Sequence, residues 1–552
     1  AGQAGLQPHG GAARYLGEDR EAGKGRPVII LGIGGVLGDA AAAILKDGEL
    51  AAAVEESKLV RRRMHWGGRD PLPERAIAMC LELAGAKPEQ VDAVAVARPV
   101  PEKDFYLRLR SQFPMSRITL VEHHLAHAAS AYFTSPFDEA TVLTLDRGGD
   151  FRCGSRWAGR GASMTIEQEH YSPDSLCDVY SRVTELLGFE ANVDEHKVQW
   201  LSVRGDERFR DLFLEILKAD EGGLHVDRAF FSSERPHSGG FGHRFYAALG
   251  LEDGAPIPEA LRAPIAAGVQ QAAETAVMRL AGQGRNLCLA GGLGFNALLV
   301  SALENRSGFE NVFVQPVAGN AGTAIGAALE TWHHLFRQEK RVRLETLSLG
   351  PSYSAAETKQ VLENCKLRFH YLLTTEELIA AAVAQLNEHK IVAWMHGRME
   401  FGARALGNRS ILASPLDPYS TENLNTFIKH REPVRKFAAS VPAELAGEYF
   451  EVGPNARYLA TVGRVRPQHR EKFAAAILAG DLVRVHTVDA RENPLYWKLL
   501  HAAGESTGLP VLYNTSFNLF GEPLVSDPRD AVRSFYSSGI DAMFVGNFFL
   551  QK

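Results

Sequence analysis

Residues 28–54 read VIILGIGGVLGDAAAAILKDGELAAAV, and this stretch decides the fold of the first part of the chain. Val28-Ile29-Ile30-Leu31 predicts a short buried strand, and a cluster of glycines follows it. A dinucleotide-binding fold would need a helix after such glycines. Instead, two mostly apolar runs flank Asp47-Gly48, a dipeptide typical of a β-hairpin. The stretch therefore predicts a strand, a glycine turn, a second strand, a hairpin turn and a third strand.

A second beginning of the same kind occurs at residues 140–150, ATVLTLDRGGD, where a strand again runs into an aspartate and glycines. Two such beginnings indicate an internal duplication. They resemble the start of actin/hexokinase-like (ASKHA) domains, in which the hairpin grips nucleotide phosphates or a metal. The expected fold class is α/β. We expect a flexible tail over residues 1–26, a duplicated ASKHA-like domain over residues 27–344 and a second α/β domain over residues 345–552.

Composition narrows the classes of function. The 552 residues carry a formal net charge of −6, which argues against generic binding to nucleic acid or to a membrane surface. The five cysteines are isolated and form no CxxC motif, which favours a reducing, cytoplasmic location. No apolar run reaches the roughly 18 residues of a membrane span. The first 26 residues lack the apolar core of a signal peptide.

The C-terminal part contains an unusual concentration of arginine and glycine. Residues 397–410 read GRMEFGARALGNRS, residues 429–436 read KHREPVRK, and residues 514–518 read NTSFN. Arginine side chains and backbone N–H groups at glycines are what proteins use to hold phosphate or carboxylate oxygens. A solvated basic face would not need the glycines. These stretches therefore predict an anion-binding site.

His123 and His127 are four residues apart and would share one face of a helix. Two imidazoles at this spacing can bind one divalent ion, and Asp146, at the end of the following strand, can add an oxygen ligand. His124 should point away. The spacing alone also fits two helix histidines that only cap or pack, so both interpretations stay open.

These stretches resemble the NodU/CmcH-type carbamoyltransferases, the family of the antibiotic-carbamoylating enzymes, and the resemblance runs from about Val28 to Lys552. It implies a C-terminal YrdC-like domain that binds carbamoyl phosphate and ATP with Mg²⁺ and makes carbamoyl adenylate. The N-terminal domain would then transfer the carbamoyl group to a hydroxyl of a small-molecule acceptor, a specialised metabolite. The resemblance also implies a divalent metal, with Fe²⁺ the first expectation, in the N-terminal domain.

The resemblance assigns roles to particular residues. In the reaction site, cationic groups neutralise the phosphates and polar groups orient the carbamoyl moiety: Arg404, Lys429, Arg435, Asn514 and Ser516. Further residues bind the nucleotide or carbamoyl phosphate, or support those that do: Gly291, Gly292, Asn296, Arg398, Glu400, Arg409, Ser410, Arg431 and Asn518. The metal ligands would be His123, His127, Asp146 and, in a later glycine-rich segment, Asn320.

Several positions depart from the family pattern. Relatives usually have aspartate at the position of Asn320, and an amide oxygen is a weaker ligand for a hard cation. They also usually have histidine where this chain has Gly38, next to Asp39. These departures leave open a partner subunit that only binds nucleotide or carbamoyl phosphate. The hairpin and the two turns with aspartate and glycines also leave open an ASKHA-type small-molecule kinase. A homodimer or a complex with a homologous subunit fits either reading.

Overall fold

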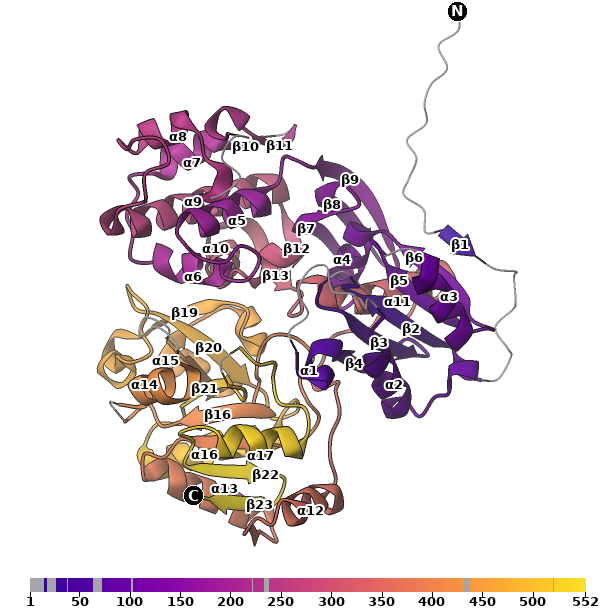
Figure 1. The fold of residues 1–552 in the computed structure, drawn as a ribbon, viewed down its shortest axis with the longest axis vertical. Coiled ribbons are helices and arrows are strands. Elements are labelled where there is room, and N and C mark those ends of the chain that lie inside the picture. Colours follow the sequence, from indigo (N-terminus) through magenta and orange to yellow (C-terminus); the bar gives the residue numbers. More distant parts are fainter. Residues whose placement is uncertain are drawn as a thin grey trace, which may run out of the picture.

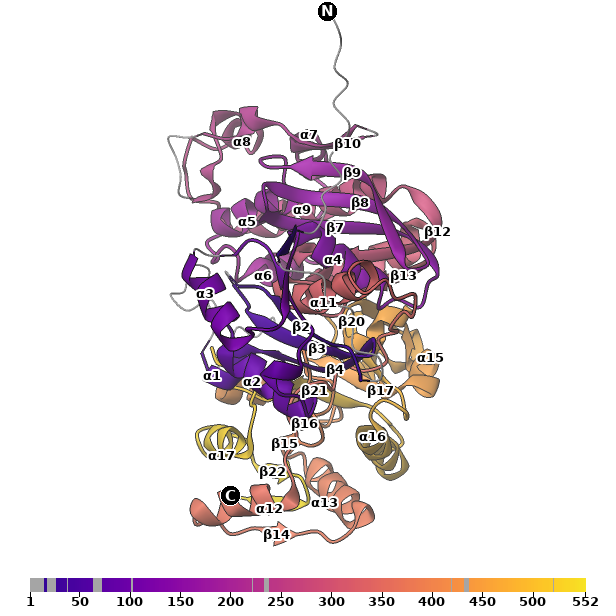
Figure 2. The same cartoon turned by 90° about the vertical axis from the view of Figure 1, so that its right-hand side faces the viewer.

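The computed structural model in Figure 1 describes residues 14–16, 26–36, 38–62, 72–100, 103–220, 222–232, 238–417, 419–430, 436–519 and 521–552. The chain forms an N-terminal domain with two sheets and a C-terminal domain built on one large sheet (Figures 1 and 2). No helix in these ranges has the length and apolar character needed to cross a membrane.

The two sheets of the N-terminal domain repeat one topology. The first has the order β6 (Arg117–Val121), β5 (Ala93–Ala97), β2 (Ile29–Gly34), β3 (Ala41–Lys46) and β4 (Glu49–Glu55), with β1 (Arg14–Leu16) added beside β6. The second has the order β13 (Gly308–Val314), β12 (Gln283–Ala290), β7 (Glu139–Gly149), β8 (Arg152–Arg160) and β9 (Ser163–Tyr171).

In each sheet the strands β2, β3 and β4, or β7, β8 and β9, are antiparallel neighbours. On the other side of β2 or β7, the later strands β5 and β6, or β12 and β13, pair in parallel. The strands β2 and β7 are those predicted from residues 28–31 and 140–145. The duplicated ASKHA-like fold is therefore confirmed. The Asp47-Gly48 turn joins β3 to β4 as the hairpin signal predicts.

Helices α4 (His123–Tyr132) and α11 (Thr323–His334) pack against each other between the two sheets (Figure 2). Their approach is close at Gly326, where a Cβ atom would lie 1.8 Å from the carbonyl oxygen of Ala126. Small residues on both helices therefore allow the two backbones to touch. This crossing fixes the position of α4, which carries the predicted metal ligands.

The other α-helices cover the outer faces of these sheets and the region around β10 (Leu217–Asp220) and β11 (Gly223–Val226). They are α1 (Glu56–Val60), α2 (Glu74–Leu83), α3 (Lys103–Gln112), α5 (Leu176–Leu186), α6 (Glu195–Ser202), α7 (Arg210–Ile216), α8 (His243–Ala248), α9 (Glu259–Ala281) and α10 (Ala297–Arg306).

The C-terminal domain has a mixed sheet of ten strands. Their order is β14 (His370–Tyr371), β23 (Phe548–Gln551), β22 (Ala542–Val545), β15 (Val392–Met395), β16 (Arg409–Ala413), β21 (Leu512–Ser516), β17 (Ala438–Pro442), β20 (Leu482–Val488), β19 (Val462–Val465) and β18 (Phe450–Glu451). Alternate residues of these strands face opposite sides of the sheet. Thus Val392 and Trp394 pack with one helix layer, and Ala393 and Met395 with the other.

The first layer contains α13 (Thr375–Asn387) and α16 (Pro494–Thr507), and the second contains α12 (Ala355–Asn364) and α17 (Pro528–Tyr536). The shorter helices are α14 (Ser420–Asn423), which continues into a π-helical turn over Leu424–Lys429, and α15 (Ala446–Tyr449). This arrangement is a second α/β domain, in agreement with the predicted fold class, and its bounds at residues 345 and 552 stay predictions.

The segment between the domains is held by both of them. The backbone N–H of Ala53, in β4, donates to Leu349 O, and the N–H groups of Gly350 and Phe401 donate to Met399 O and Leu347 O. The predicted linker around residues 345–351 therefore lies between the N-terminal sheet and the arginine-rich segment of the C-terminal domain.

Candidate functional site

Helix α4 brings His123 and His127 onto one face beside Asp146. The helix begins at His123 because the Glu122 carboxylate accepts hydrogen bonds from two backbone N–H groups of the first turn. The Nε2 atoms of His123 and His127 lie 3.2 and 3.1 Å from Asp146 Oδ2. The structure thus brings the three predicted side chains together, and their role as metal ligands stays a prediction.

The hydrogen bonds of His123 leave two acceptor atoms facing each other. His123 Nδ1 lies 3.2 Å from the carbonyl oxygen of Arg98, which can only accept, so Nδ1 carries a proton. In the neutral ring Nε2 is then an acceptor, and it faces the Asp146 carboxylate. The contact therefore needs a positive charge between Nε2 and Oδ2. When a proton supplies it, burial disfavours the charged ring, but the contacts with Asp146 prevail and raise the pKa of His123, while the two histidines hold the pKa of the buried Asp146 well below its usual range. A cation between these atoms would relieve the contact, so the residues present fit a bound metal.

The neighbouring histidines differ in orientation. Burial lowers the pKa of His127, and its Nδ1 is buried without a hydrogen-bond partner among the described residues. His124 points away, with Nδ1 2.8 Å from Thr144 Oγ1 and Nε2 3.1 Å from Arg152 O. The pair that shares Asp146 is therefore His123 and His127.

The predicted nucleotide turn lies against the same carboxylate. A Cβ atom on Gly291, which has φ +93°, would meet Leu145 O at 2.1 Å, and one on Gly292 would lie 3.2 Å from Asp146 Oδ1. Asn296 caps α10 through a hydrogen bond accepted from the N–H of Leu299. The glycines therefore allow the β12 turn to approach the end of β7, while the side chain of Asn296 is engaged in capping.

Asn320 lies in the turn before α11, which packs against α4, β2 and β3. Its Oδ1 is buried and has no hydrogen-bond partner in the part of the chain that the structure describes. Gly38 and Asp39, with φ +64° at Asp39, lie in the turn between β2 and β3. Asn320 as a fourth ligand stays a prediction.

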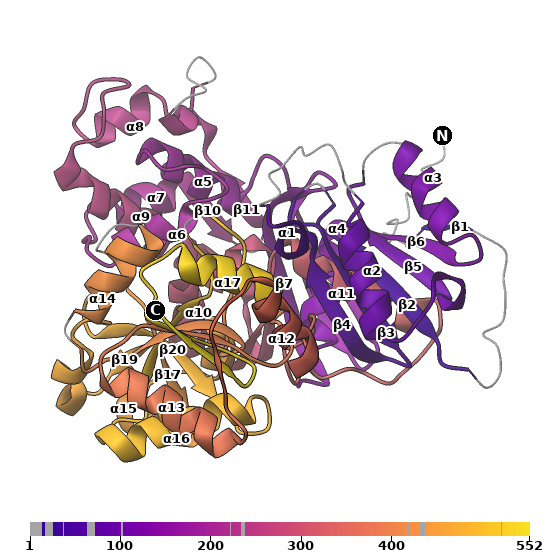
Figure 3. The ribbon, with the colours of Figure 1, turned by 60° about the horizontal axis from the view of Figure 1, so that its bottom comes forward.

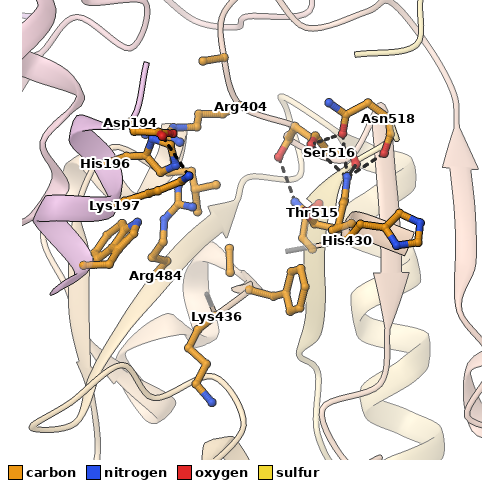
Figure 4. Close-up of a pocket in the computed structure, with 18 of the residues that line it drawn as sticks. Asp194, His196, Lys197, Arg404, His430, Lys436, Arg484, Thr515, Ser516 and Asn518 are labelled. Atoms are coloured by element: carbon orange, nitrogen blue, oxygen red, sulfur yellow. Dashed lines mark hydrogen bonds and ion pairs between the residues drawn. The ribbon is translucent and has the colours of Figure 1, made fainter. Parts of the chain in front are cut away.

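A cavity of about 880 Å³ lies between the two domains (Figure 4). One wall comes from α6 and residues 190–194 of the N-terminal domain, and the others from β17, β20, β21 and neighbouring loops of the C-terminal domain. Its lining includes five lysines and arginines but two carboxylates, although the whole chain has net charge −6. The charged lining residues are Lys197, Arg404, Lys429, Lys436, Arg484, Glu190 and Asp194.

Lys429 ends the π-helical turn and is 4% exposed. Its Nζ lies 2.5 Å from Ser516 O, 2.9 Å from Asn518 O and 2.7 Å from Asn518 Oδ1. The ammonium group therefore fixes the turn after β21 and brings a positive charge to the cavity wall. π-Helical turns are frequent at functional sites.

Four of the predicted residues line the cavity beside Lys429: Arg404, Asn514, Ser516 and Asn518. Asn514 Nδ2 donates to Ala405 O, and its Oδ1 is buried without a partner among the described residues. Ser516 Oγ donates to Asn518 Oδ1 at 2.7 Å. The cavity thus combines cationic groups with an amide oxygen and a hydroxyl at hydrogen-bonding positions.

The other predicted residues of the segment 397–410 do not line the cavity. Arg398 donates to the carbonyl oxygens of Ala51, Leu349 and Gly350. Arg409 is buried and donates to four carbonyl oxygens, and burial lowers its pKa to about 10. Glu400 accepts from three backbone N–H groups, and Ser410 Oγ accepts from a fourth. These contacts shape the loop that presents Arg404.

Arg431 and Arg435 lie outside the described residues.

Conversely, sequence reasoning assigned no role to several cavity residues: His196, Lys197, Trp200, His430, Lys436 and Arg484. Arg484 lies over the Trp200 ring, 5.7 Å from its centroid, so one pair joins the two domains across the wall. Residues 194–201 read DEHKVQWL, which differs from the EGKVMGLA pattern usual in the family that the sequence resembles, and this difference was the available signal for α6. No local sequence pattern identifies Arg484 as a cavity residue.

A short chain of contacts joins the histidine site to the cavity. Arg147 follows Asp146, and its Nη1 donates to Asn192 Oδ1 at 2.8 Å. Asn192 precedes Val193 and Asp194, which line the cavity. The two candidate sites are therefore connected through one loop of the N-terminal domain.

Comparison with known proteins assigns both halves of the chain to one family. A family model described as Carbamoyltransferase N-terminus matches residues 103–329, and one described as Carbamoyltransferase C-terminus matches residues 383–552. An uncharacterized protein of Synechocystis sp. is 32% identical, covering 95% of this chain and 96% of that protein. The nodulation protein NolNO of Sinorhizobium fredii is also 32% identical, covering 93% and 79%. A 3'-hydroxymethylcephem-O-carbamoyltransferase of Amycolatopsis lactamdurans is 30% identical, covering 49% of each chain.

Proposed function

This chain belongs to the carbamoyltransferase family, and we propose that it makes carbamoyl adenylate from carbamoyl phosphate and ATP and transfers the carbamoyl group to a hydroxyl of a small molecule. The observation that carries the proposal is the interdomain cavity. It gathers Lys429, Arg404, Asn514 and Ser516 in a space large enough for a nucleotide.

The first half-reaction suits the charges of this cavity. Carbamoyl phosphate loses its phosphate to water, and an oxygen of the resulting carbamate bonds to the α-phosphorus of ATP as pyrophosphate leaves. Both substrates, with Mg²⁺ on the nucleotide, bring several phosphate charges into one space. Arg404 and Lys429 can neutralise the charge that develops, and arginine can bind phosphate oxygens in pairs. The Asn514 oxygen can accept a hydrogen bond from the carbamoyl NH₂ group.

The second half-reaction is proposed for the N-terminal domain. The acceptor oxygen bonds to the carbamoyl carbon, AMP leaves, and the hydroxyl proton passes to a base. His123, His127 and Asp146 would hold a divalent ion, and two imidazoles with one carboxylate suit Fe²⁺. Such an ion supplies a positive charge that polarises a carbonyl oxygen. The chain itself contributes the neutral His127 ring and the contact path through Arg147 to the cavity.

The acceptor is proposed to be a small specialised metabolite. The cephem relative is named for O-carbamoylation of a small molecule. Arg147 and Asn192 link the two sites along one loop of the N-terminal domain, and this short connection supports transfer of the adenylate, which hydrolyses in water, from one site to the other within a single chain.

The experiment that tests this proposal measures pyrophosphate release from ATP by the purified chain, with and without carbamoyl phosphate and without any acceptor. We expect release that depends on carbamoyl phosphate. An acceptor screen by mass spectrometry, looking for a carbamoyl mass increment, then tests the second half-reaction. Binding of ATP without carbamoyl-phosphate-dependent release would contradict the proposal and favour the partner-subunit alternative.

A further inference from the structure

The short helix α1 of the N-terminal domain contacts the two loops that present cavity residues in the C-terminal domain. Figure 3 shows α1 on the side of its domain that faces α17. The side chains involved are those of Glu55, Lys58 and Arg61, at the end of β4, within α1 and just after it. None of them lines the cavity.

Glu55 and Lys58 hold the loop that presents Arg404. Lys58 Nζ lies 2.8 Å from both Glu400 O and Gly402 O, and 2.9 Å from Glu55 Oε2. Glu55 Oε1 in turn accepts a hydrogen bond from the N–H of Gly402 at 2.7 Å. The side chains of Glu55 and Lys58 are 9% and 6% exposed, so this contact is almost dry. Both backbone polar groups of Gly402, two residues before Arg404, are therefore fixed by the other domain.

Arg61 holds the second loop. Its Nε lies 3.2 Å from Asp530 Oδ2, its Nη2 lies 3.4 Å from Glu522 Oε2, and its Nη1 donates to Leu524 O. The carbonyl oxygen of Glu522 accepts a hydrogen bond from Asn518 Nδ2 at 2.7 Å. Asn518 also accepts from Lys429. Three contacts, through Glu522 and Asn518, thus link Arg61 to the lysine on the cavity wall.

The start of α1 is fixed on the opposite side. The N–H of Glu56 donates to Ala40 O at 2.9 Å, next to Asp39 in the turn between β2 and β3. The Glu56 carboxylate accepts from the N–H groups of Arg75 and Ala76 at the start of α2. The helix is therefore anchored at its start in its own domain, while Lys58 and Arg61 contact the two loops of the C-terminal domain.

We propose that Lys58 and Arg61 are positioning residues, through which the N-terminal domain sets the geometry of the adenylate-forming cavity. This inference rests on the proposed function. Misplacement of a reacting group by about 1 Å can lower a rate by roughly 100-fold even when binding is retained. A contact that only joined the domains would change stability and leave the kinetics of the folded protein unchanged.

The test uses the full-length chain with Arg61→Met and with the double variant Glu55→Gln/Lys58→Met, which removes the buried pair together. The matched control is Lys340→Met, because Lys340 pairs with Glu49 at 3.1 Å on the exposed far end of β4. Carbamoyl-phosphate-dependent pyrophosphate release gives kcat and the KM for ATP, and circular dichroism shows that each variant is folded. We expect kcat to fall by roughly 10- to 100-fold with a smaller change in KM, and the control to match the wild type.

Folded Arg61→Met protein with wild-type kcat and KM would overturn the inference, whether or not the double variant folds. Wild-type protein without carbamoyl-phosphate-dependent release would instead refute the proposed function. In that case the inference falls with the function on which it rests, so the wild-type assay distinguishes the failure of the function from the failure of the positioning role.

Discussion

Lys429 combines two tasks that its contacts make inseparable. Its ammonium group binds oxygens of Ser516 and Asn518, and the same charge lines the cavity. Lys429→Ala should therefore both loosen the turn after β21 and remove a cation from the site. We expect carbamoyl-phosphate-dependent pyrophosphate release to fall by at least about 100-fold. The exposed Lys472 provides the control Lys472→Ala, and full release by folded Lys429→Ala protein would remove Lys429 from the mechanism.

The histidine site makes a separate prediction at the same scale. His127→Ala removes one of the two imidazoles that share Asp146 Oδ2. Protein purified and dialysed against metal-free buffer, then analysed by plasma mass spectrometry, should lose nearly all of its bound divalent metal. His225→Gln changes an exposed histidine and should retain the wild-type content. Equal metal content in both variants would show that the metal, if bound, lies elsewhere.

Residue type alone could not distinguish the three arginines of the segment 397–410. The sequence pattern predicted an anion site there, and Arg404 lines the cavity. Arg398 and Arg409 instead donate to backbone carbonyls, because the linker over residues 349–351 lies beside both of them. Their surroundings come from residues far along the chain, such as Ala51 and Pro351. Single-sequence reasoning has no access to those distances.

At the scale of elements, the crossing of α4 and α11 depends on Gly326. A Cβ atom there would lie 1.8 Å from Ala126 O, so Gly326→Ala must push the helices apart. We expect a loss of about 1–3 kcal/mol in unfolding free energy, or more if the backbone cannot shift. Gly447→Ala, in α15, is the matched control because no atom lies within 4 Å of its added Cβ. Thermal unfolding of both variants measures the difference, and equal melting temperatures would contradict the tight crossing.

The elements differ in how well the sequence predicted them. The strands β2 and β7 were predicted because each is a short, mostly apolar run that ends at glycines, a local pattern typical of a buried strand. The role of α6 as a cavity wall was not, since His196 and Trp200 gain that role only from the approach of β20. Local pattern therefore gave the elements and their order, whereas the pairing of walls across the domain boundary required the structure.

At the scale of the whole molecule, two buried histidines should make stability fall in acid. Burial lowers the pKa of His486 to about 3, and burial together with the charge of Arg409 lowers that of His396 to about 3. Below pH 6.5 these two histidines bind protons in the unfolded chain but stay neutral in the folded chain. The free energy of unfolding therefore falls as the pH drops from 6.5 towards 3. Each histidine should cost about 2 kcal/mol at pH 5.

Thermal unfolding between pH 7.5 and pH 5 checks this expectation. His486→Gln should melt with a weaker dependence on pH than the wild type, because it removes one buried ring whose pKa is lowered. His370→Gln, which changes an exposed histidine, should keep the wild-type dependence. An identical dependence in all three proteins would contradict the assigned acid sensitivity.

The shared walls of the interdomain cavity have a consequence for how such proteins can diverge. Trp200 and Arg484 meet across the boundary, although nearly three hundred positions separate them in the chain. A hybrid gene that joined the first half of this sequence to the second half of a relative would combine wall residues that had never been selected together. Exchanging either half alone should therefore fail more often than its percentage identity suggests, and recombination should favour inheritance of both halves as one unit.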